Sequence, residues 1–260
     1  MCFKWCVLCC LGFIFSLNAA SVIVYTEPNP PFNFREKGMI QGLGFDLLEA
    51  SMISLRSKIA QDEIYLGTWK EVYKEALDHP NTFLISTTKI KEREPYFQWI
   101  GPIATVRLGV IAKRGTDIPK GHSTIEILRP LKIATVKETS SEKVLFNEIG
   151  ENHNLNITRV STPAQGYKML EYGRVDALIY TDVPFVYYLI SEGQDVSQYK
   201  MVHVLLNTDY YIAAGKSVPK EQIQIMQAQL NHLKEPDGKG GSSMYDRIMA
   251  NYLKGVVLQP

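Results

Sequence analysis

Residues 84–94 read Leu84-Ile85-Ser86-Thr87-Thr88-Lys89-Ile90-Lys91-Glu92-Arg93-Glu94, an apolar run that ends in hydroxyl side chains and continues into charged ones. A short β-rich run bounded by polar residues is typical of a buried strand. Arg93 follows Thr88 by five residues, so a guanidinium and hydroxyls come after one strand end. A guanidinium fork can meet a carboxylate with two parallel charge-assisted hydrogen bonds. Taken alone, residues 89–94 are more typical of a solvated charged surface.

Similar β-rich runs recur on both sides of this segment, mostly with a helical pattern between them. They cover residues 22–25, 64–66, 83–85, 108–112, 133–136, 157–160, 175–180, 201–206 and 210–214. Helix starts are indicated by two capping-box spacings, at Thr68 and at Thr139, and by Thr162, which precedes a proline. Strands that alternate with helices favour α/β sheets of the parallel type over a β-sandwich.

The first twenty residues have the order of a secretory signal peptide. Lys4 precedes an apolar run over residues 5–17, and Asn18-Ala19-Ala20 supplies the small residues of a cleavage site. We therefore expect residues 1–20 to be cleaved and the mature chain to begin near Ser21. The alternative is a membrane anchor, which needs about 20 apolar residues, more than this run provides. All four cysteines lie here, so we expect neither disulfides nor a cysteine metal site in the mature chain.

The charge balance of the mature chain argues against a nucleic-acid partner. The sequence has 28 basic and 27 acidic side chains, and removing Lys4 with the signal peptide leaves 27 of each. Proteins that bind nucleic acid or anionic membranes usually show a basic excess or stripe. About 240 residues lie near the size at which one hydrophobic core tends to split into two. Two lobes are therefore plausible on length alone.

Motifs for cofactors, metals and covalent catalysis are missing from the sequence. Gly42-Leu43-Gly44 lacks the third glycine of a dinucleotide fingerprint. The five histidines are scattered, with no pair at the spacing of metal ligands. The sequence has neither a serine nucleophile elbow nor a cysteine nucleophile in the mature chain. We predict no cofactor, no metal and no enzymatic activity.

Several motifs together resemble the family 3 extracellular solute-binding proteins, which include periplasmic binders of polar amino acids. The motifs lie at residues 22–32, 44–47, 86–93, 101–102, 173–177 and 245–253, so the resemblance covers essentially the whole mature chain. It implies a two-lobed α/β fold, the type II periplasmic-binding-protein fold, with two sheets flanked by helices and joined by a two-strand hinge. The implied boundaries are residues 21–105 and 207–260 for the first lobe and 106–206 for the second.

The resemblance also implies which residues hold a ligand's α-carboxylate. Ser86, Thr88 and Arg93 take this role in the first lobe. From the second lobe, Thr139 and Ser140 open a helix whose free backbone N–H groups and dipole favour an anion. A plain helix cap at Thr139 is compatible with the same role.

Three further site residues are expected beside the carboxylate clamp. Asp182 takes the place of the family's acceptor for the α-ammonium group, although it could equally cap the helix that follows it. Glu27 lies where some relatives place an acid that contacts a cationic ligand side chain, but residues 26–32 are one residue shorter than in those relatives. Trp69 is either a wall of the pocket or part of the core.

The function implied by the resemblance is capture of a small amino-acid-like ligand by hinge closure. We expect a monomeric periplasmic protein that delivers its ligand to a membrane permease, an ABC-type transporter. One alternative is a ligand-sensing input protein for a signalling partner. Another is a dehydratase or lyase on the same fold, with a carboxylate such as Glu27 or Asp182 transferring protons.

Overall fold

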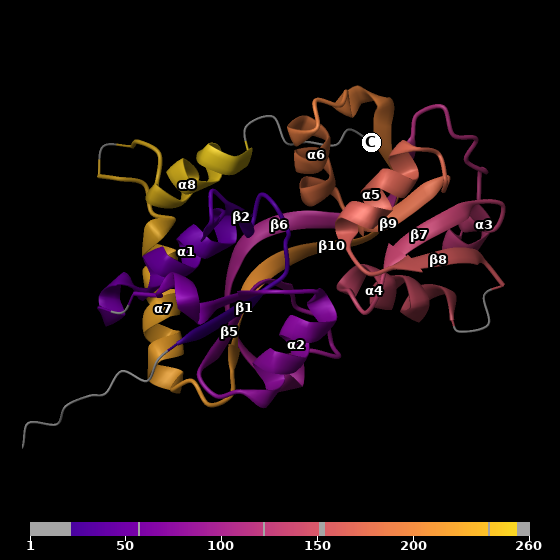
Figure 1. The fold of residues 1–260 in the computed structure, drawn as a ribbon. Helices are drawn as coiled ribbons and strands as arrows, with labels where there is room; N and C mark the ends of the chain where they lie inside the picture. Colours follow the sequence, from indigo (N-terminus) through magenta and orange to yellow (C-terminus); the bar gives the residue numbers. More distant parts are fainter. Residues whose placement is uncertain (1–21, 57, 122, 151–153, 239, 254–260) are drawn as a thin grey trace, which may run out of the picture.

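The protein consists of two α/β lobes connected by two long strands (Figure 1). The computed structural model describes residues 22–56, 58–121, 123–150, 154–238 and 240–253. The predicted signal peptide, with all four cysteines, lies outside these residues. None of the helices in the described ranges has the length and apolar character that a membrane-crossing segment needs.

The first lobe is built from the two ends of the chain. Its N-terminal elements are β1 (Ile23–Thr26), β2 (Phe34–Glu36), β3 (Met39–Gln41), α1 (Leu43–Met52), β4 (Ile64–Leu66), α2 (Trp69–Asp78) and β5 (Thr82–Thr88). The C-terminal helices α7 (Lys220–Leu233) and α8 (Met244–Leu253) return to this lobe, where both contact α1. Short helical turns lie at Ile53–Leu55, Gln61–Glu63 and Glu94–Tyr96.

The second lobe is continuous in sequence. It contains α3 (Thr124–Leu128), β7 (Lys132–Val136), α4 (Ser140–Ile149), β8 (Asn156–Val160), α5 (Pro163–Glu171), β9 (Ala177–Thr181) and α6 (Asp182–Ser191), with a helical turn at Val196–Gln198. Its helix starts follow the sequence signals, because Thr139 and Thr162 accept hydrogen bonds from the N–H groups of Glu142 and Gln165.

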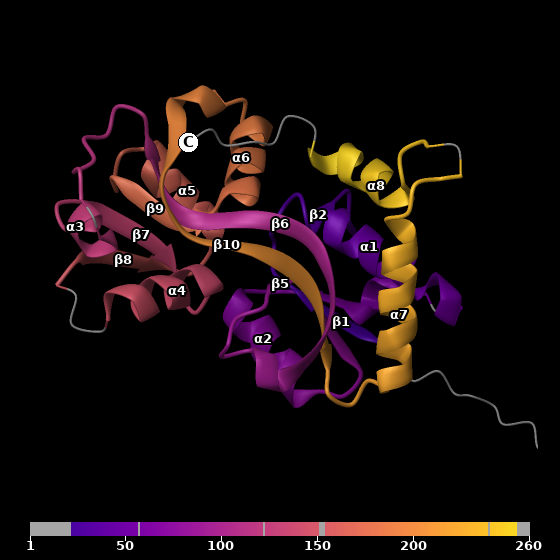
Figure 2. The same ribbon diagram turned by 180° about the vertical axis from the view of Figure 1, so that it is seen from behind.

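Two long strands, β6 (Phe97–Lys113) and β10 (Tyr199–Gly215), run through both lobes. They pair antiparallel along their whole length, from Phe97 opposite Gly215 to Lys113 opposite Tyr199. The sheets of the two lobes are therefore continuous, and the strand order is β4-β1-β5-β10-β6-β9-β7-β8. Strands β2 and β3 form a separate two-stranded sheet. Figure 2 shows β6 and β10 side by side between the lobes. The implied lobe boundaries fall inside these two strands and stay a prediction.

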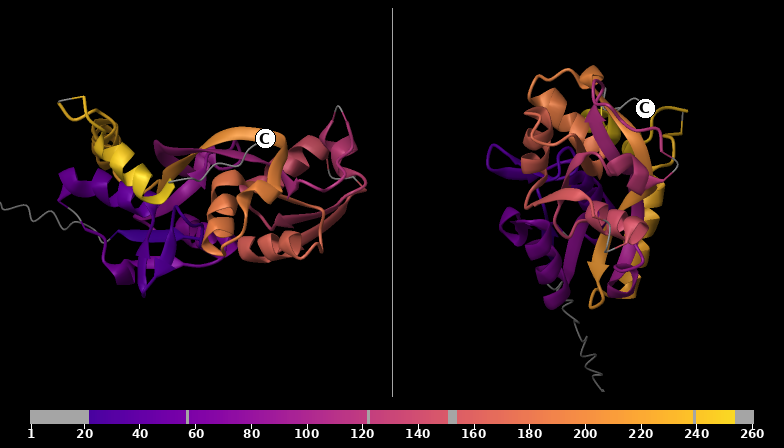
Figure 3. Two further views of the ribbon diagram at one scale, coloured as in Figure 1. Left: turned by 90° about the horizontal axis from the view of Figure 1, so that it is seen from above. Right: turned by 90° about the vertical axis from the view of Figure 1, so that its right-hand side faces the viewer.

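Each lobe has apolar packing on both faces of its sheet, which follows from the alternation of side chains along a strand. In β5, Phe83 and Ile85 join a core under α1 and α7, whereas Leu84 faces α2. In β9, Leu178 joins a core with α5 and α6, whereas Ile179 faces α3 and α4. The two views in Figure 3 show helices on both sides of the strands in each lobe. Strands buried on both faces end in polar residues where the lobes meet.

Candidate functional site

A narrow cavity lies between the two lobes and is lined by both. About 290 Å³ of space, open solvent included, lies between its walls. The lining residues are Glu27, Trp69, Ser86, Thr88, Arg93 and Tyr210 of the first lobe and Thr139, Ser140, Ser141, Tyr180 and Thr181 of the second. Seven of the eight site residues predicted from the sequence are thus brought together, and Asp182 is the exception.

Ser86 is held in the cavity wall by the end of β5 and the start of α1. Its φ of 55° is in the left-handed region, which costs a non-glycine residue of the order of 1 kcal/mol. Its hydroxyl is buried and has no hydrogen-bond partner. Gly44 passes so close that a Cβ there would lie 2.3 Å from the Ser86 Oγ. A strained backbone and a glycine neighbour together leave room for one unpaired hydroxyl.

Arg93 is the dominant charge of the cavity. Its side chain is only 1% exposed, and its guanidinium carbon lies 4.1 Å from the ring centre of Trp69. Nη1 donates to the Thr88 carbonyl at 3.2 Å, but Nε and Nη2 are buried without a partner. Burial lowers the pKa of Arg93 to about 10, so it stays charged at neutral pH. Two donors of a buried cation are therefore left for an anion.

The N-terminus of α4 faces this cation from the second lobe. Thr139 caps the helix, because its Oγ1 accepts the Glu142 N–H at 3.5 Å while donating to the Val136 carbonyl at 2.8 Å. Ser140 donates to the Thr88 hydroxyl of the first lobe at 3.1 Å. The first N–H groups of a helix and its dipole favour an anion at this end. Arginine, hydroxyls and helix N-terminus thus converge on one side of the cavity.

Glu27 and the two buried tyrosines Tyr180 and Tyr210 also line the cavity. Burial raises the pKa of Glu27 from 4.5 to about 7, against the lowering effect of the nearby Arg93. Tyr210 and Thr181 share a hydrogen bond of 3.1 Å between the lobes. Burial also raises the pKa of Tyr210 to about 12, so its hydroxyl stays protonated. Glu27 is thus one titratable carboxylate among neutral hydroxyls.

Trp69 has both of the roles considered from the sequence. It is the first residue of α2, is 6% exposed, and packs with Val72 and Ala76 in the apolar core beneath that helix. Its ring also stacks on the Arg93 guanidinium, a cation–π contact that helps to hold a buried charge.

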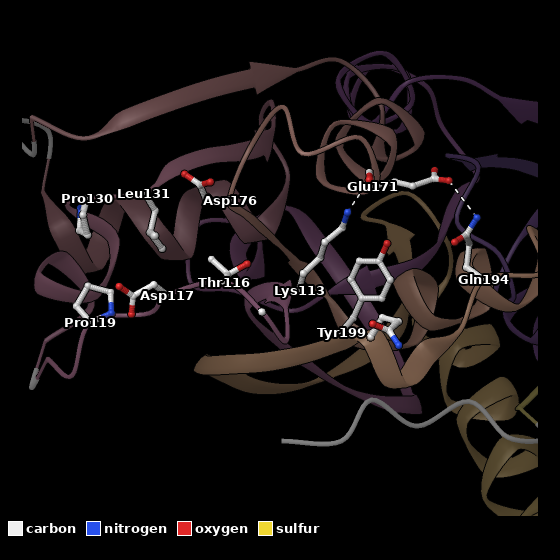
Figure 4. A pocket seen from close by; sticks show the side chains of 12 residues that line it. Lys113, Thr116, Asp117, Pro119, Pro130, Leu131, Glu171, Asp176, Gln194 and Tyr199 are labelled. Carbon is white, nitrogen blue, oxygen red and sulfur yellow. Dashed lines mark hydrogen bonds between the residues drawn. The ribbon is translucent and has the colours of Figure 1, made fainter.

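A second, wider hollow lies at the far end of the second lobe (Figure 4). Three of its polar side chains, Lys113, Glu171 and Asp176, already have partners. Lys113 donates to the Glu171 carbonyl at 2.7 Å, Glu171 accepts from Tyr188 and Gln194, and Asp176 accepts the backbone N–H of Lys132. We assign no binding role to it. Within the described residues, no group of three or more acidic or histidine side chains is placed to hold a metal ion.

Known structures share this fold, although no family model and no curated protein matches the sequence. A substrate-binding protein of an amino acid ABC transporter is 21% identical, with a TM-score of 0.69, over 90% of this chain and 100% of that one. A histidine kinase sensor domain similar to periplasmic binding proteins is 20% identical, with a TM-score of 0.72, over 92% and 98%. An ancestral amino-acid-binding protein, a precursor of cyclohexadienyl dehydratase, is 21% identical, with a TM-score of 0.69, over 89% and 94%.

The chain has the type II periplasmic-binding-protein fold. Identities this low establish the fold alone, and function has to be argued from the site. In binding proteins of this kind, two lobes close around a ligand by hinge motion. The cavity described above lies between the lobes and next to the connecting strands.

Asp182, predicted from the sequence as an acceptor for a ligand ammonium group or as a helix cap, has partners within the protein. It is the first residue of α6 and does not line the cavity, although Thr181 before it does. Its carboxylate accepts the backbone N–H of Arg107 at 3.0 Å, the Arg107 Nε at 2.7 Å and the N–H of Val183 at 2.8 Å. Since Arg107 lies 75 residues away in the sequence, local pattern could not reveal this pair.

Sequence reasoning missed four lining residues, Ser141, Tyr180, Thr181 and Tyr210. Ser141 follows the predicted helix start and could have been included with it. Tyr180 and Tyr210 end and begin apolar runs, where a tyrosine is ordinary core. These two tyrosines differ from ordinary core residues only because they lie where the two lobes meet.

Proposed function

We propose that the protein is a periplasmic solute-binding protein of the family 3 type, which holds a small amino-acid-like ligand between its lobes. The observation that carries this proposal is the buried Arg93, whose Nε and Nη2 are unpaired beside the unpaired Ser86 hydroxyl. Leaving such groups without partners costs about 1–3 kcal/mol each, and more for charged ones. A ligand carboxylate would satisfy both residues.

The carboxylate is clamped from both lobes. The Arg93 fork and the hydroxyls of Ser86 and Thr88 bind it from the first lobe. Thr139 and Ser140, with the N–H groups that open α4, bind it from the second. Because each lobe supplies part of the clamp, the ligand interacts more strongly with closed lobes than with open ones, which is what shifts an equilibrium toward closure.

A cationic group of the ligand is held by the carboxylate of Glu27, which lines the cavity together with Tyr180 and Tyr210. Micromolar affinity corresponds to about −8 kcal/mol, which several charge-assisted hydrogen bonds of roughly 1.5–3 kcal/mol each can provide after the costs of ordering. No cofactor takes part in this function, and the ligand leaves unchanged.

The protein acts outside the cytoplasm as a monomer and delivers its ligand to a membrane permease. The predicted signal peptide and the relation in fold to a transporter's binding protein support this role. Nucleic acid is not a partner, because the mature chain has no basic excess.

A thermal-shift screen of residues 21–260 against the twenty amino acids, ornithine, polyamines, small peptides and organic acids tests the proposal. A ligand at 100 times its dissociation constant adds about 2.7 kcal/mol to the stability of the folded protein. Stabilisation by at least one α-amino acid, lost in Arg93→Ala, is expected. Stabilisation by none of them would overturn the proposal.

Two alternative functions have a specific observation in their favour. The fold relation to a histidine kinase sensor domain favours a sensing role, which predicts that deleting the gene changes a ligand response without reducing uptake. The pKa of Glu27, raised to about 7, suits a general acid or base and favours a lyase or dehydratase. Mass spectrometry of a ligand incubated with the protein would show turnover in the second case and an unchanged ligand in the case of binding alone.

A further inference from the structure

The cavity is lined by two ionisable side chains of opposite charge. Among the described lining residues, Arg93 is the one cation and Glu27 the one carboxylate. The other lining groups are hydroxyls, an indole and backbone. The site therefore has one positive and one negative charge to offer a ligand, and a buried ion without a partner is strongly disfavoured.

Asp182 is not available as a second negative charge. Three N–H donors, two of Arg107 and one of Val183, already occupy its carboxylate at 2.7–3.0 Å. Only 9% of its side chain is exposed. Freeing it for a ligand would leave Arg107 of β6 without this partner. Asp182 is thus a positioning residue that ties the start of α6 to a connecting strand.

We infer that Glu27, not Asp182, is the counter-ion of the ligand's α-ammonium group, and that the ligand is an α-amino acid with an uncharged side chain. This inference rests on the proposed function. When the ligand carboxylate pairs with Arg93, Glu27 loses its nearby cation and needs another one. The α-ammonium supplies it, after which no acid remains for a cationic side chain and no base for an anionic one.

The groups that face Glu27 fit this assignment. Arg93 reaches it from the segment after β5, Tyr210 from β10, Tyr180 from β9 and Tyr167 from α5, and all four interact electrostatically with its carboxylate. The three tyrosines are neutral at physiological pH because burial raises their pKa values. Burial likewise raises the pKa of Glu27 to about 7. Because the unliganded closed form described here carries this raised pKa, binding of an ammonium group to it releases a proton from Glu27 below this pH.

Calorimetric titration tests the side-chain class first. The wild type, residues 21–260, is titrated with all twenty amino acids at pH 8. We expect the tightest binding from an amino acid with an uncharged side chain, with arginine, lysine, aspartate and glutamate at least about tenfold weaker. Tightest binding of arginine or lysine would overturn the inference and leave the proposed function standing. Binding of no amino acid would overturn both.

Glu27→Gln and Asp182→Asn then separate the two carboxylates. Each is titrated with the best amino acid and with its α-hydroxy counterpart, in which a hydroxyl replaces the ammonium group. We expect the wild type to prefer the amino acid by about tenfold or more, Glu27→Gln to lose this preference, and Asp182→Asn to keep it even if both affinities fall. Loss of the preference in Asp182→Asn, with retention in Glu27→Gln, would overturn the inference.

The pH dependence gives a readout that a purely structural role of Glu27 would not change. Titrations at pH 6 in two buffers of different ionisation enthalpy should show proton release by the wild type and none by Glu27→Gln. Affinity of the wild type should fall between pH 8 and pH 6, whereas that of Glu27→Gln should stay constant. Equal proton release by both proteins would rule out Glu27 as the counter-ion.

Discussion

Arg93 concentrates the binding energy of the proposed site in one side chain. Removing one partner of a buried charged pair costs about 2–5 kcal/mol, so we expect Arg93→Ala to weaken ligand binding by roughly 30-fold or more. Isothermal titration calorimetry measures the change. Lys91→Ala is the matched control, because Lys91 belongs to the same charged segment but is exposed. Wild-type affinity of Arg93→Ala would remove Arg93 from the site.

Gly44 offers a test of the Ser86 geometry that does not touch the ligand contacts themselves. An alanine inside a helix is ordinarily more favourable than glycine by about 1 kcal/mol. Here its Cβ would collide with the Ser86 hydroxyl, so Gly44→Ala should weaken ligand binding by about tenfold. Gly238→Ala, where nothing lies within 4 Å of an added Cβ, should bind normally. Unchanged affinity of Gly44→Ala would show that the Ser86 hydroxyl is not needed.

At the residue scale, the residues of the candidate site were predictable where they lie close together in the sequence. Ser86, Thr88 and Arg93 lie within eight positions, and the strand and turn between them place them on one wall of the cavity. The role of Asp182 depends on Arg107, which pairing of β6 with β9 brings beside it. Such a partner is fixed by tertiary structure, so the sequence allowed a ligand acceptor and a helix cap equally.

At the scale of elements, an ion pair connects α2 of the first lobe with the turn before α4 of the second. Lys70 of α2 pairs with Glu138 at 3.1 Å, and both side chains are largely exposed. Exposed ion pairs contribute up to about 1 kcal/mol and are screened by salt. We expect Lys70→Ala to weaken ligand binding by up to about fivefold at low salt, with the difference vanishing near 1 M salt.

Lys74→Ala is the control for this pair. Lys74 lies one helical turn further along α2 and pairs at 2.8 Å with Asp78 of the same helix, so it makes no contact between the lobes through this pair. Its removal should leave affinity unchanged at every salt concentration. A salt-independent loss in Lys70→Ala would point instead to altered packing of α2.

Elements were predictable where local signals coincide. The caps at Thr68, Thr139 and Thr162 all begin helices. The lengths of β6 and β10 were not predictable, because only parts of each, such as residues 108–112 and 201–206, stand out as apolar runs. Their remaining residues become strand by pairing with each other, and β6 also contains Gly101-Pro102, which locally argues against a strand.

At the scale of the whole molecule, closure of the lobes should depend on pH even without ligand. The arrangement of the lobes described here leaves Glu27 only half-exposed, and removal from water raises its pKa from 4.5 to about 7. Opening returns the carboxyl to water and its pKa toward the ordinary value. Protonated Glu27 therefore favours closure, and this contribution is lost as pH rises from about 5 through 7. Fluorescence transfer between labels on the two lobes should report more closed protein at pH 5.5 than at pH 8.

Glu27→Gln should remove this pH dependence, because an amide carries no charge at either pH. A closed fraction that still changes with pH in Glu27→Gln would assign the effect to other groups. If the closed fraction of the wild type does not change with pH, closure of the lobes does not shift the pKa of Glu27.

The order of strands in the sheet has a consequence for how the chain must fold as it emerges. In the first lobe, β10 lies between β5 and β6, although about 85 residues separate β6 from β10 in the sequence. Until β10 arrives, β5 and one side of β6 present unpaired edges, which are sites of aggregation. The second lobe, continuous between them, can assemble earlier. In a chain synthesised or exported from its N-terminus, the second lobe should thus fold before the first lobe is complete. Such a chain should depend on chaperones until residue 215 is free.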